Sequence, residues 1–230
     1  MKCLLGAVAL ILSSLGALAQ GVAPLAGHVL FVTEFSRNVS LGTSDKNKWS
    51  DYTSRNLTWS RTADGLEVFT GSAASVLVDT KTYLHYPAAP GTSKLTETVS
   101  QSSNREGQKL EPGTSWKADR TYVSVPVSYC SSNNHNIDSK FEVAAQEPYT
   151  LIIDGKETTL QVTPVVERGW WNRCYSGRRY TRLLVSKDLG AVVSIEHIGY
   201  TGQGQAHESS YRFNVKEIQI PLRVSFDRNR

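Results

Sequence analysis

Apolar and polar residues alternate along most of the chain with the two-residue period of β-strands. Three pairs of alternating runs are each joined by a short turn sequence, which is typical of β-hairpins. The paired runs are residues 56–62 with 66–70, 149–153 with 158–167, and 179–186 with 191–200. Asp-Gly sequences mark the first two turns, and residues 187–190 form the third. The pattern therefore predicts an antiparallel β-protein.

Shorter β-rich runs and two polar loops are expected in the rest of the chain. The runs are residues 28–35, 75–79, 82–86, 122–129, 140–145 and 209–224. The polar stretches 87–113 and 131–139 predict loops, the first with one brief strand at 94–100. Two halves divided near residue 105 would each be a small, poorly covered sheet. We therefore expect a single all-β domain over residues 20–230, either a curved antiparallel half-barrel or a β-sandwich with long loops.

The N-terminus has the pattern of a signal peptide. Lys2 precedes an apolar run at residues 4–12, and Ala17-Leu18-Ala19 fits the small-x-small pattern before a cleavage point. The run is short for a membrane span, which disfavours the alternative of an uncleaved anchor. We expect a signal peptide at residues 1–19, cleaved after Ala19, and a periplasmic or secreted chain. No later segment is apolar for long enough to cross a membrane.

Cys130 and Cys174 are the two cysteines that remain after such a cleavage. In an oxidising compartment, two cysteines are most simply paired, so we expect one disulfide between them. A free, nucleophilic Cys174 is the alternative. Arg173, Arg178 and Arg179 would then supply positive charge, and His135 or His197 would act as base.

The sequence GWWNRCYSGRRYTR, residues 169–182, carries the candidate binding residues. It predicts a strand, a turn at Ser176-Gly177 and a second strand. Adjacent tryptophans in a strand face opposite ways, so one is expected in the core and the other at the surface, where it could stack on a sugar ring or meet a partner. The alternative is that the second tryptophan packs under a loop and the arginines are solvated. The candidate binding residues are Trp170, Trp171, Arg173, Arg178 and Arg179.

Motifs of catalysis and metal binding are missing from the sequence. It contains no HExxH, no CxxC, no G-x-S-x-G and no closely spaced histidine pair, and Cys130-x4-His135 alone is a weak metal signal. The formal net charge of +4 is too small to indicate a nucleic-acid partner. We therefore assign no catalytic residue, metal or cofactor, and we expect no nucleic acid.

Two phrases resemble strand sequences of a group of bacterial periplasmic β-proteins of uncharacterised function. They are LEPGTSW at residues 110–116 and RLLVSKDLGAVVSIE at residues 182–196. Such proteins resemble the lipoprotein-carrier group, and the resemblance covers residues 83–200. It implies an unclosed antiparallel β-barrel whose concave face can hold acyl chains or a partner. It carries over no functional residue, and the long polar loop and the cysteine pair depart from it.

Three classes of function remain. The preferred class is a non-catalytic binding protein outside the cytoplasm, with a lipid, another apolar ligand or an envelope protein as its partner. A carbohydrate- or surface-binding module is the second, and it predicts an exposed tryptophan at position 170 or 171. An extracytoplasmic hydrolase is the third, and it predicts a histidine clustered with a carboxylate. The first is preferred because the sequence lacks catalytic signatures.

Overall fold

β-strands make up most of the part of the chain that the structure describes. The computed structural model describes residues 24–39, 48–71, 75–88, 98–105, 108–123, 134–172, 176–200 and 210–220. The strands in these residues are β1 (Val29–Arg37), β2 (Thr53–Arg61), β3 (Leu66–Thr70), β4 (Ser75–Asp79), β5 (His85–Ala88), β6 (Thr98–Ser103), β7 (Ser115–Val123), β8 (Asn134–Val143), β9 (Glu147–Ile153), β10 (Lys156–Asn172), β11 (Ser176–Ser186), β12 (Ala191–Tyr200) and β13 (Tyr211–Gln219). The prediction of an all-β fold is confirmed.

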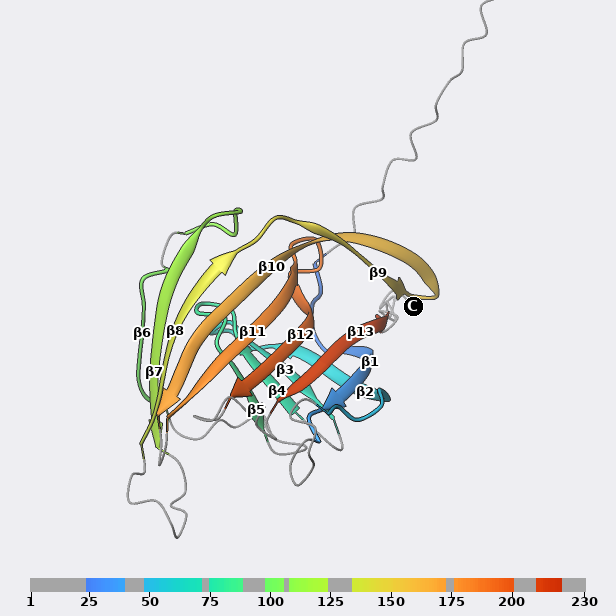
Figure 1. Ribbon diagram of the computed structural model, residues 1–230. Coiled ribbons are helices and arrows are strands. Elements are labelled where there is room, and N and C mark those ends of the chain that lie inside the picture. The colour runs from blue at the N-terminus through green and yellow to red at the C-terminus, as the bar shows by residue number, and fades with distance from the viewer. Residues whose placement is uncertain are drawn as a thin grey trace, which may run out of the picture.

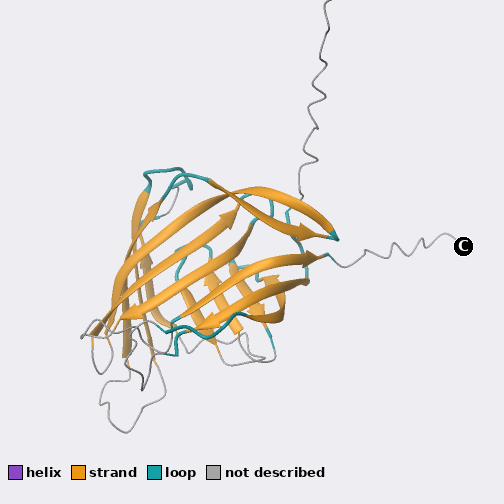
Figure 2. Cartoon of the chain, turned by 45° about the vertical axis from the view of Figure 1, so that its right-hand side comes forward, coloured by secondary structure: helices purple, strands orange, loops and turns teal. Residues whose placement is uncertain are grey.

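All of these strands belong to one curved sheet. The order is β5-β4-β3-β2-β1-β13-β12-β11-β10-β8-β7-β6, and β9 pairs with parts of β10 and β13. The pairings are antiparallel except for a short parallel contact between β9 and β13. The sheet curves so that β3–β5 lie behind the long strands β11 and β12 (Figure 1), and the long strands cross the molecule at a slant (Figure 2). A single curved sheet corresponds to the half-barrel rather than to a sandwich.

One backbone pairing joins the first five strands to the last eight. Along β1, residues 30–37 pair with residues 219–211 of β13. Among the described residues, no other backbone ladder links these two halves of the sheet. The first and last strands therefore lie side by side in the middle of the strand order.

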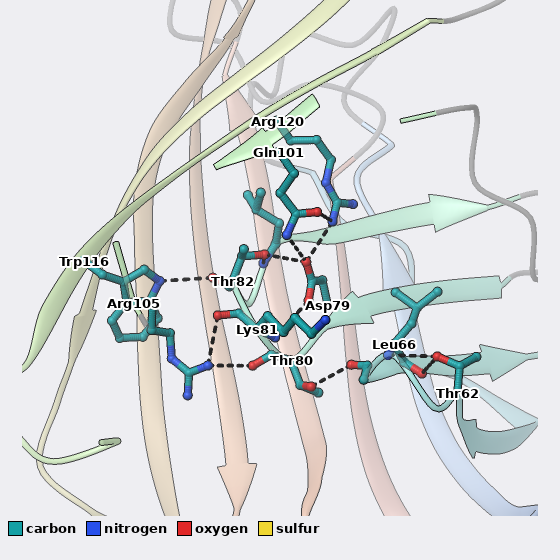
Figure 3. A network of polar contacts seen from close by, with 12 residues as sticks. Thr62, Leu66, Asp79, Thr80, Lys81, Thr82, Gln101, Arg105, Trp116 and Arg120 are labelled. Atoms are coloured by element: carbon teal, nitrogen blue, oxygen red, sulfur yellow. Dashed lines mark hydrogen bonds and ion pairs between the residues drawn. The ribbon is translucent and has the colours of Figure 1, made fainter. Parts of the chain in front are cut away.

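Polar side chains bridge the two ends of the sheet, β4–β5 and β6–β7 (Figure 3). The Asp79 carboxylate at the end of β4 accepts a hydrogen bond from Gln101 Nε2 on β6, at 2.7 Å, and one from an Arg120 guanidinium nitrogen on β7, at 2.8 Å. Asp79 and Arg120 are both buried. We call these contacts the seam. Here side-chain hydrogen bonds hold neighbouring strands together, whereas backbone hydrogen bonds do so elsewhere in the sheet.

The turn after β4 provides the rest of the seam. Arg105 donates to the Thr80 carbonyl at 2.7 Å, and the buried Trp116 indole donates to the Thr82 carbonyl at 3.1 Å. Tyr83 has a positive φ of 61° in the same turn, and its ring lies 6.1 Å from the Trp116 ring. The seam therefore joins the two ends of the sheet through ring packing and hydrogen bonds of side chains.

The turn between β11 and β12 lies against β3 on the opposite wall of the half-barrel, with its Leu189 side chain buried. The Val192 N–H donates to the Glu67 carboxylate on β3 at 3.0 Å, and the Arg61 guanidinium binds both Glu67 and the Gly190 carbonyl. The Trp59 indole is a further donor to Glu67, at 3.1 Å. Burial raises the pKa of the Glu67 carboxyl, and these hydrogen bonds oppose the rise. Glu67 thus ties the turn to the opposite wall.

The inner face is covered with the protein's own side chains. Large apolar residues from most of the strands are almost fully buried there. Close ring pairs join them, such as Trp116 stacked on Phe141 at 5.2 Å and Phe69 beside Phe213, also at 5.2 Å. The concave face is a packed core, which the burial of this much apolar surface stabilises.

The three hairpins expected from the sequence are confirmed as β2–β3, β9–β10 and β11–β12. Gly65 and Gly155 have φ values of 90° and 79°, which explains why both Asp-Gly turns need glycine.

Other boundaries were wrong. β7 starts at Ser115 rather than near residue 122, and β8 starts at Asn134, inside the expected loop 131–139. Ser176 and Gly177 begin β11 instead of forming a turn. Outward-facing polar residues in these strands gave them the composition of loops.

Candidate functional site

Alternate residues of the long strands face the packed interior and the solvent. On β10, Glu167 is fully buried, while the side chain of Arg168 is 66% exposed and Trp170 is 53% exposed. Residues that pair directly across neighbouring strands lie on the same face. The strand register therefore defines one polar row inside the half-barrel and others outside it.

The inner polar row consists of Glu167, Thr181, His197 and Tyr211, which lie abreast on β10, β11, β12 and β13. His85 of β5 reaches this row from the opposite wall. Its Nδ1 lies 2.7 Å from the Tyr211 hydroxyl, and its Nε2 lies 2.9 Å from the Thr181 hydroxyl. The His197 Nδ1 is 3.0 Å from the same threonine hydroxyl.

The inner network also contains a buried ion pair between Arg179 and Glu167. The Arg179 Nε lies 2.7 Å from a Glu167 carboxylate oxygen, which also accepts a hydrogen bond from the Ser139 hydroxyl. A guanidinium nitrogen of Arg179 is 3.0 Å from His85 Nε2. Because arginine can only donate, this nitrogen of His85 accepts, and the proton of the neutral ring is assigned to Nδ1.

The inner network favours the neutral form of His85. Burial, the neighbouring His197 and the cationic Arg179 together lower the pKa of His85 well below its usual value of 6.5. Burial also raises the pKa of Tyr211. A histidine 3.8 Å from the Glu167 carboxylate is the kind of pair that the hydrolase hypothesis expected. However, His85, Glu167 and Thr181 are at most 1% exposed, so these groups bind one another and a substrate does not reach them.

On the outer face, a second row of residues includes an exposed tryptophan and its polar neighbours. We call it the Trp170 row. It runs in direct register across β7, β8, β10, β11 and β12. Its members are Asp119, Asp138, Trp170, Arg178 and Tyr200. It places two carboxylates on one side of the indole ring and a guanidinium on the other.

Trp170 is exposed but fixed in orientation. A hydrogen bond from its side chain to the Asp138 carboxylate lowers the pKa of Asp138, whereas burial and the facing carboxylate of Asp119 raise it. The two raising effects prevail, so the pKa of Asp138 is above its usual value. A ring held by a neighbouring carboxylate loses less freedom when a ligand stacks on it. The row thus offers a flat apolar surface bordered by hydrogen-bond acceptors and a cation.

Glycine at position 169 permits this arrangement. A Cβ atom on Gly169 would lie 2.2 Å from the backbone oxygen of Asp138 and 2.7 Å from the Ser139 hydroxyl. β8 and β10 therefore approach closely at Gly169, next to Trp170, and a larger residue would push them apart.

The structure separates the sequence-predicted binding residues between the two faces. Trp170 and Arg178 lie together in the Trp170 row, whereas Arg179 is buried in the inner network. The backbone of Trp171 belongs to β10, but its side chain lies outside what the structure describes, as do Arg173, Cys130 and Cys174. The predicted disulfide therefore stays a prediction.

Sequence reasoning missed the carboxylates Asp119 and Asp138 and the inner residues His85, Glu167 and His197. These residues come together only through the pairing register of strands that are distant in the sequence, and the alternating pattern does not reveal that register.

The described residues contain no group of three histidine, cysteine or acidic side chains that could hold a metal ion. They also contain no helix with the length and apolarity needed to span a bilayer.

Comparisons with known proteins find similarity among solved structures but not among protein families. No protein-family model matches the chain, and no curated protein matches it significantly. Among solved structures, the hypothetical lipoprotein YmcC from Escherichia coli is similar, with 13% identity and a TM-score of 0.39 over 80% of this chain and 82% of that chain. With so few identical residues and such a TM-score, the similarity assigns no function.

Proposed function

We propose that the chain is a non-catalytic binding protein that works outside the cytoplasm and binds carbohydrate on the Trp170 row. The observation that carries this proposal is Trp170 itself, a large aromatic side chain that is 53% exposed on the outer face of the sheet, near the end of β10. Aromatic rings with an apolar face and polar neighbours stack on sugar rings, whose hydroxyl groups hydrogen-bond to flanking carboxylates and guanidinium groups. The N-terminal signal pattern supports the location.

A surface site is favoured over an interior site for an apolar ligand. The resemblance to lipoprotein carriers implied a concave face that holds acyl chains. In this chain the inner face is packed with buried aromatic and aliphatic side chains, and Leu189 from the turn between β11 and β12 is buried among them. The outer face is where a large aromatic residue stays accessible.

The first test is loss of the indole ring. We expect Trp170→Ala to weaken binding to an oligosaccharide array by at least about fivefold, because stacking of an aromatic ring contributes about 1 kcal/mol or more. The melting temperature should change little, because the side chain is at the surface. Trp170→Phe should retain part of the affinity.

Tyr52 provides the matched control, since it is 50% exposed and outside the Trp170 row. Tyr52→Ala should bind as the original chain does. Unchanged binding by Trp170→Ala, or no oligosaccharide bound by the original chain, would overturn the proposal.

A further inference from the structure

Three cations lie abreast next to the Trp170 row on the same face. Lys117 faces Lys140 across β7 and β8, and Lys140 faces Arg168 across β8 and β10. All three side chains are exposed. Each lies two residues along its strand from a member of the Trp170 row, a separation of roughly 7 Å. We call Lys117, Lys140 and Arg168 the cation row.

Other cationic side chains on the outer face are paired with carboxylates more closely than those of the cation row. Farther along the face, Arg182 pairs with Glu147, and Arg212 pairs with Glu196 at 2.7 Å. In the cation row, only Arg168 has a carboxylate within 4 Å, Glu142 at 3.7 Å, when the described residues are considered. Like charges placed directly opposite each other on a sheet destabilise it. An anion bound across the row would relieve that repulsion.

We propose that the carbohydrate bound by this protein is anionic, with a sugar ring on Trp170 and its carboxylate, sulfate or phosphate groups on the cation row. This inference rests on the proposed function and adds the chemical class of the ligand. One ring on the indole and acidic groups about 7 Å farther along the strands fit a chain that carries negative charge at intervals. The sugar hydroxyl groups would donate to Asp119 and Asp138.

An anionic membrane surface fits the same face less well. Asp119 and Asp138 belong to the row of Trp170, so inserting the indole into a bilayer would press two carboxylates against negatively charged headgroups. A flexible glycan can place hydroxyl groups over the carboxylates and acidic groups over the cations. The arrangement of both signs of charge on one face thus favours the glycan.

The test compares acidic oligosaccharides with neutral counterparts of the same backbone, such as oligogalacturonate and its methyl ester, on an array of matched pairs. We expect the original chain to prefer acidic members by about tenfold, and raising NaCl from about 0.05 to 0.5 M to remove the preference. The double variant Lys117→Gln/Lys140→Gln should bind both members of a pair equally. Lys156→Gln/Lys187→Gln changes the net charge equally at two exposed positions, the first residue of β10 and the turn between β11 and β12, and should keep the preference.

The outcomes separate the two proposals. Equal binding of acidic and neutral members by the original chain would overturn the anionic ligand and leave carbohydrate binding intact. Binding of no member would overturn both. Binding to vesicles that contain phosphatidylglycerol, without binding to soluble acidic glycans, would replace the glycan with a lipid surface.

Discussion

At the scale of single residues, His85 links the stability of the protein to pH. The folded protein holds this ring uncharged, because it lies fully buried beside His197 and the cationic Arg179. In the unfolded chain the ring ionises with its ordinary pKa of about 6.5. The unfolded state therefore binds more protons than the folded state between pH 6.5 and the lowered pKa of the folded protein, so this group makes the protein less stable as the pH falls.

This linkage predicts a specific pH dependence. The free energy of unfolding should decrease as the pH is lowered from about 6.5, and His85→Gln should flatten that part of the curve. Urea denaturation at a series of pH values would measure both. The variant retains all the groups that face His85, which are Tyr211, Thr181, Arg179, Glu167 and His197. An equally steep acid loss in His85→Gln would show that another group is responsible.

At the same scale, the candidate site was only partly predictable. Trp170 and Arg178 are conspicuous in the sequence because aromatic and cationic residues are concentrated there. Asp119 and Asp138 are ordinary acidic residues in polar stretches. They become part of a site only because β7 and β8 pair in one particular register beside β10. That register is set by the packing of the whole inner face, so local pattern does not reveal it.

At the scale of elements, the turn between β11 and β12 depends on one buried carboxylate. Glu67 accepts hydrogen bonds from Trp59, Arg61 and the Val192 backbone. Glu67→Ala would leave the buried Trp59 indole and the buried Val192 N–H without this acceptor, and Arg61 would keep only the Gly190 carbonyl. The loss should lower the free energy of unfolding by about 3 kcal/mol.

Chemical denaturation would measure this loss. Glu157→Ala, at an exposed position of β10, is the control and should change stability by less than about 0.5 kcal/mol. A loss as small as that of the control would mean that the turn is held by apolar packing alone.

At the scale of elements, sequence patterns predicted the hairpins but not the long-range strand pairing. Hairpins were found because their signal is local: an alternating run, a turn with the required glycine and a second run. The starts of β7 and β8 were missed because both strands carry many outward polar residues. The pairing of β1 with β13 was not predictable, because the sequence of neither strand indicates which strand it pairs with.

At the scale of the whole molecule, the seam determines whether the two ends of the sheet stay together. Asp79→Ala removes the carboxylate that faces the buried Arg120 and should destabilise the protein by about 3 kcal/mol. Amide hydrogen exchange should accelerate in β6, whose only backbone partner among the described strands is β7, more than in β10 and β11.

Asp188→Ala, in an exposed turn, is the control for that experiment. Uniform acceleration throughout the sheet would mean that the seam has no separate opening and unfolds only with the rest of the protein.

The central position of the first and last strands bears on the order in which the chain folds. The N-terminal strands β1–β5 and the strands from β6 onward share a backbone ladder only where β1 meets β13, within the described residues. β1 is made early and then lacks its second neighbour until nearly all of the remaining chain has been synthesised. Such distant pairing slows folding. It predicts that nascent chains ending before β13 leave one edge of β1 open, and that completion of the fold is a late event controlled by the arrival of the C-terminal strand.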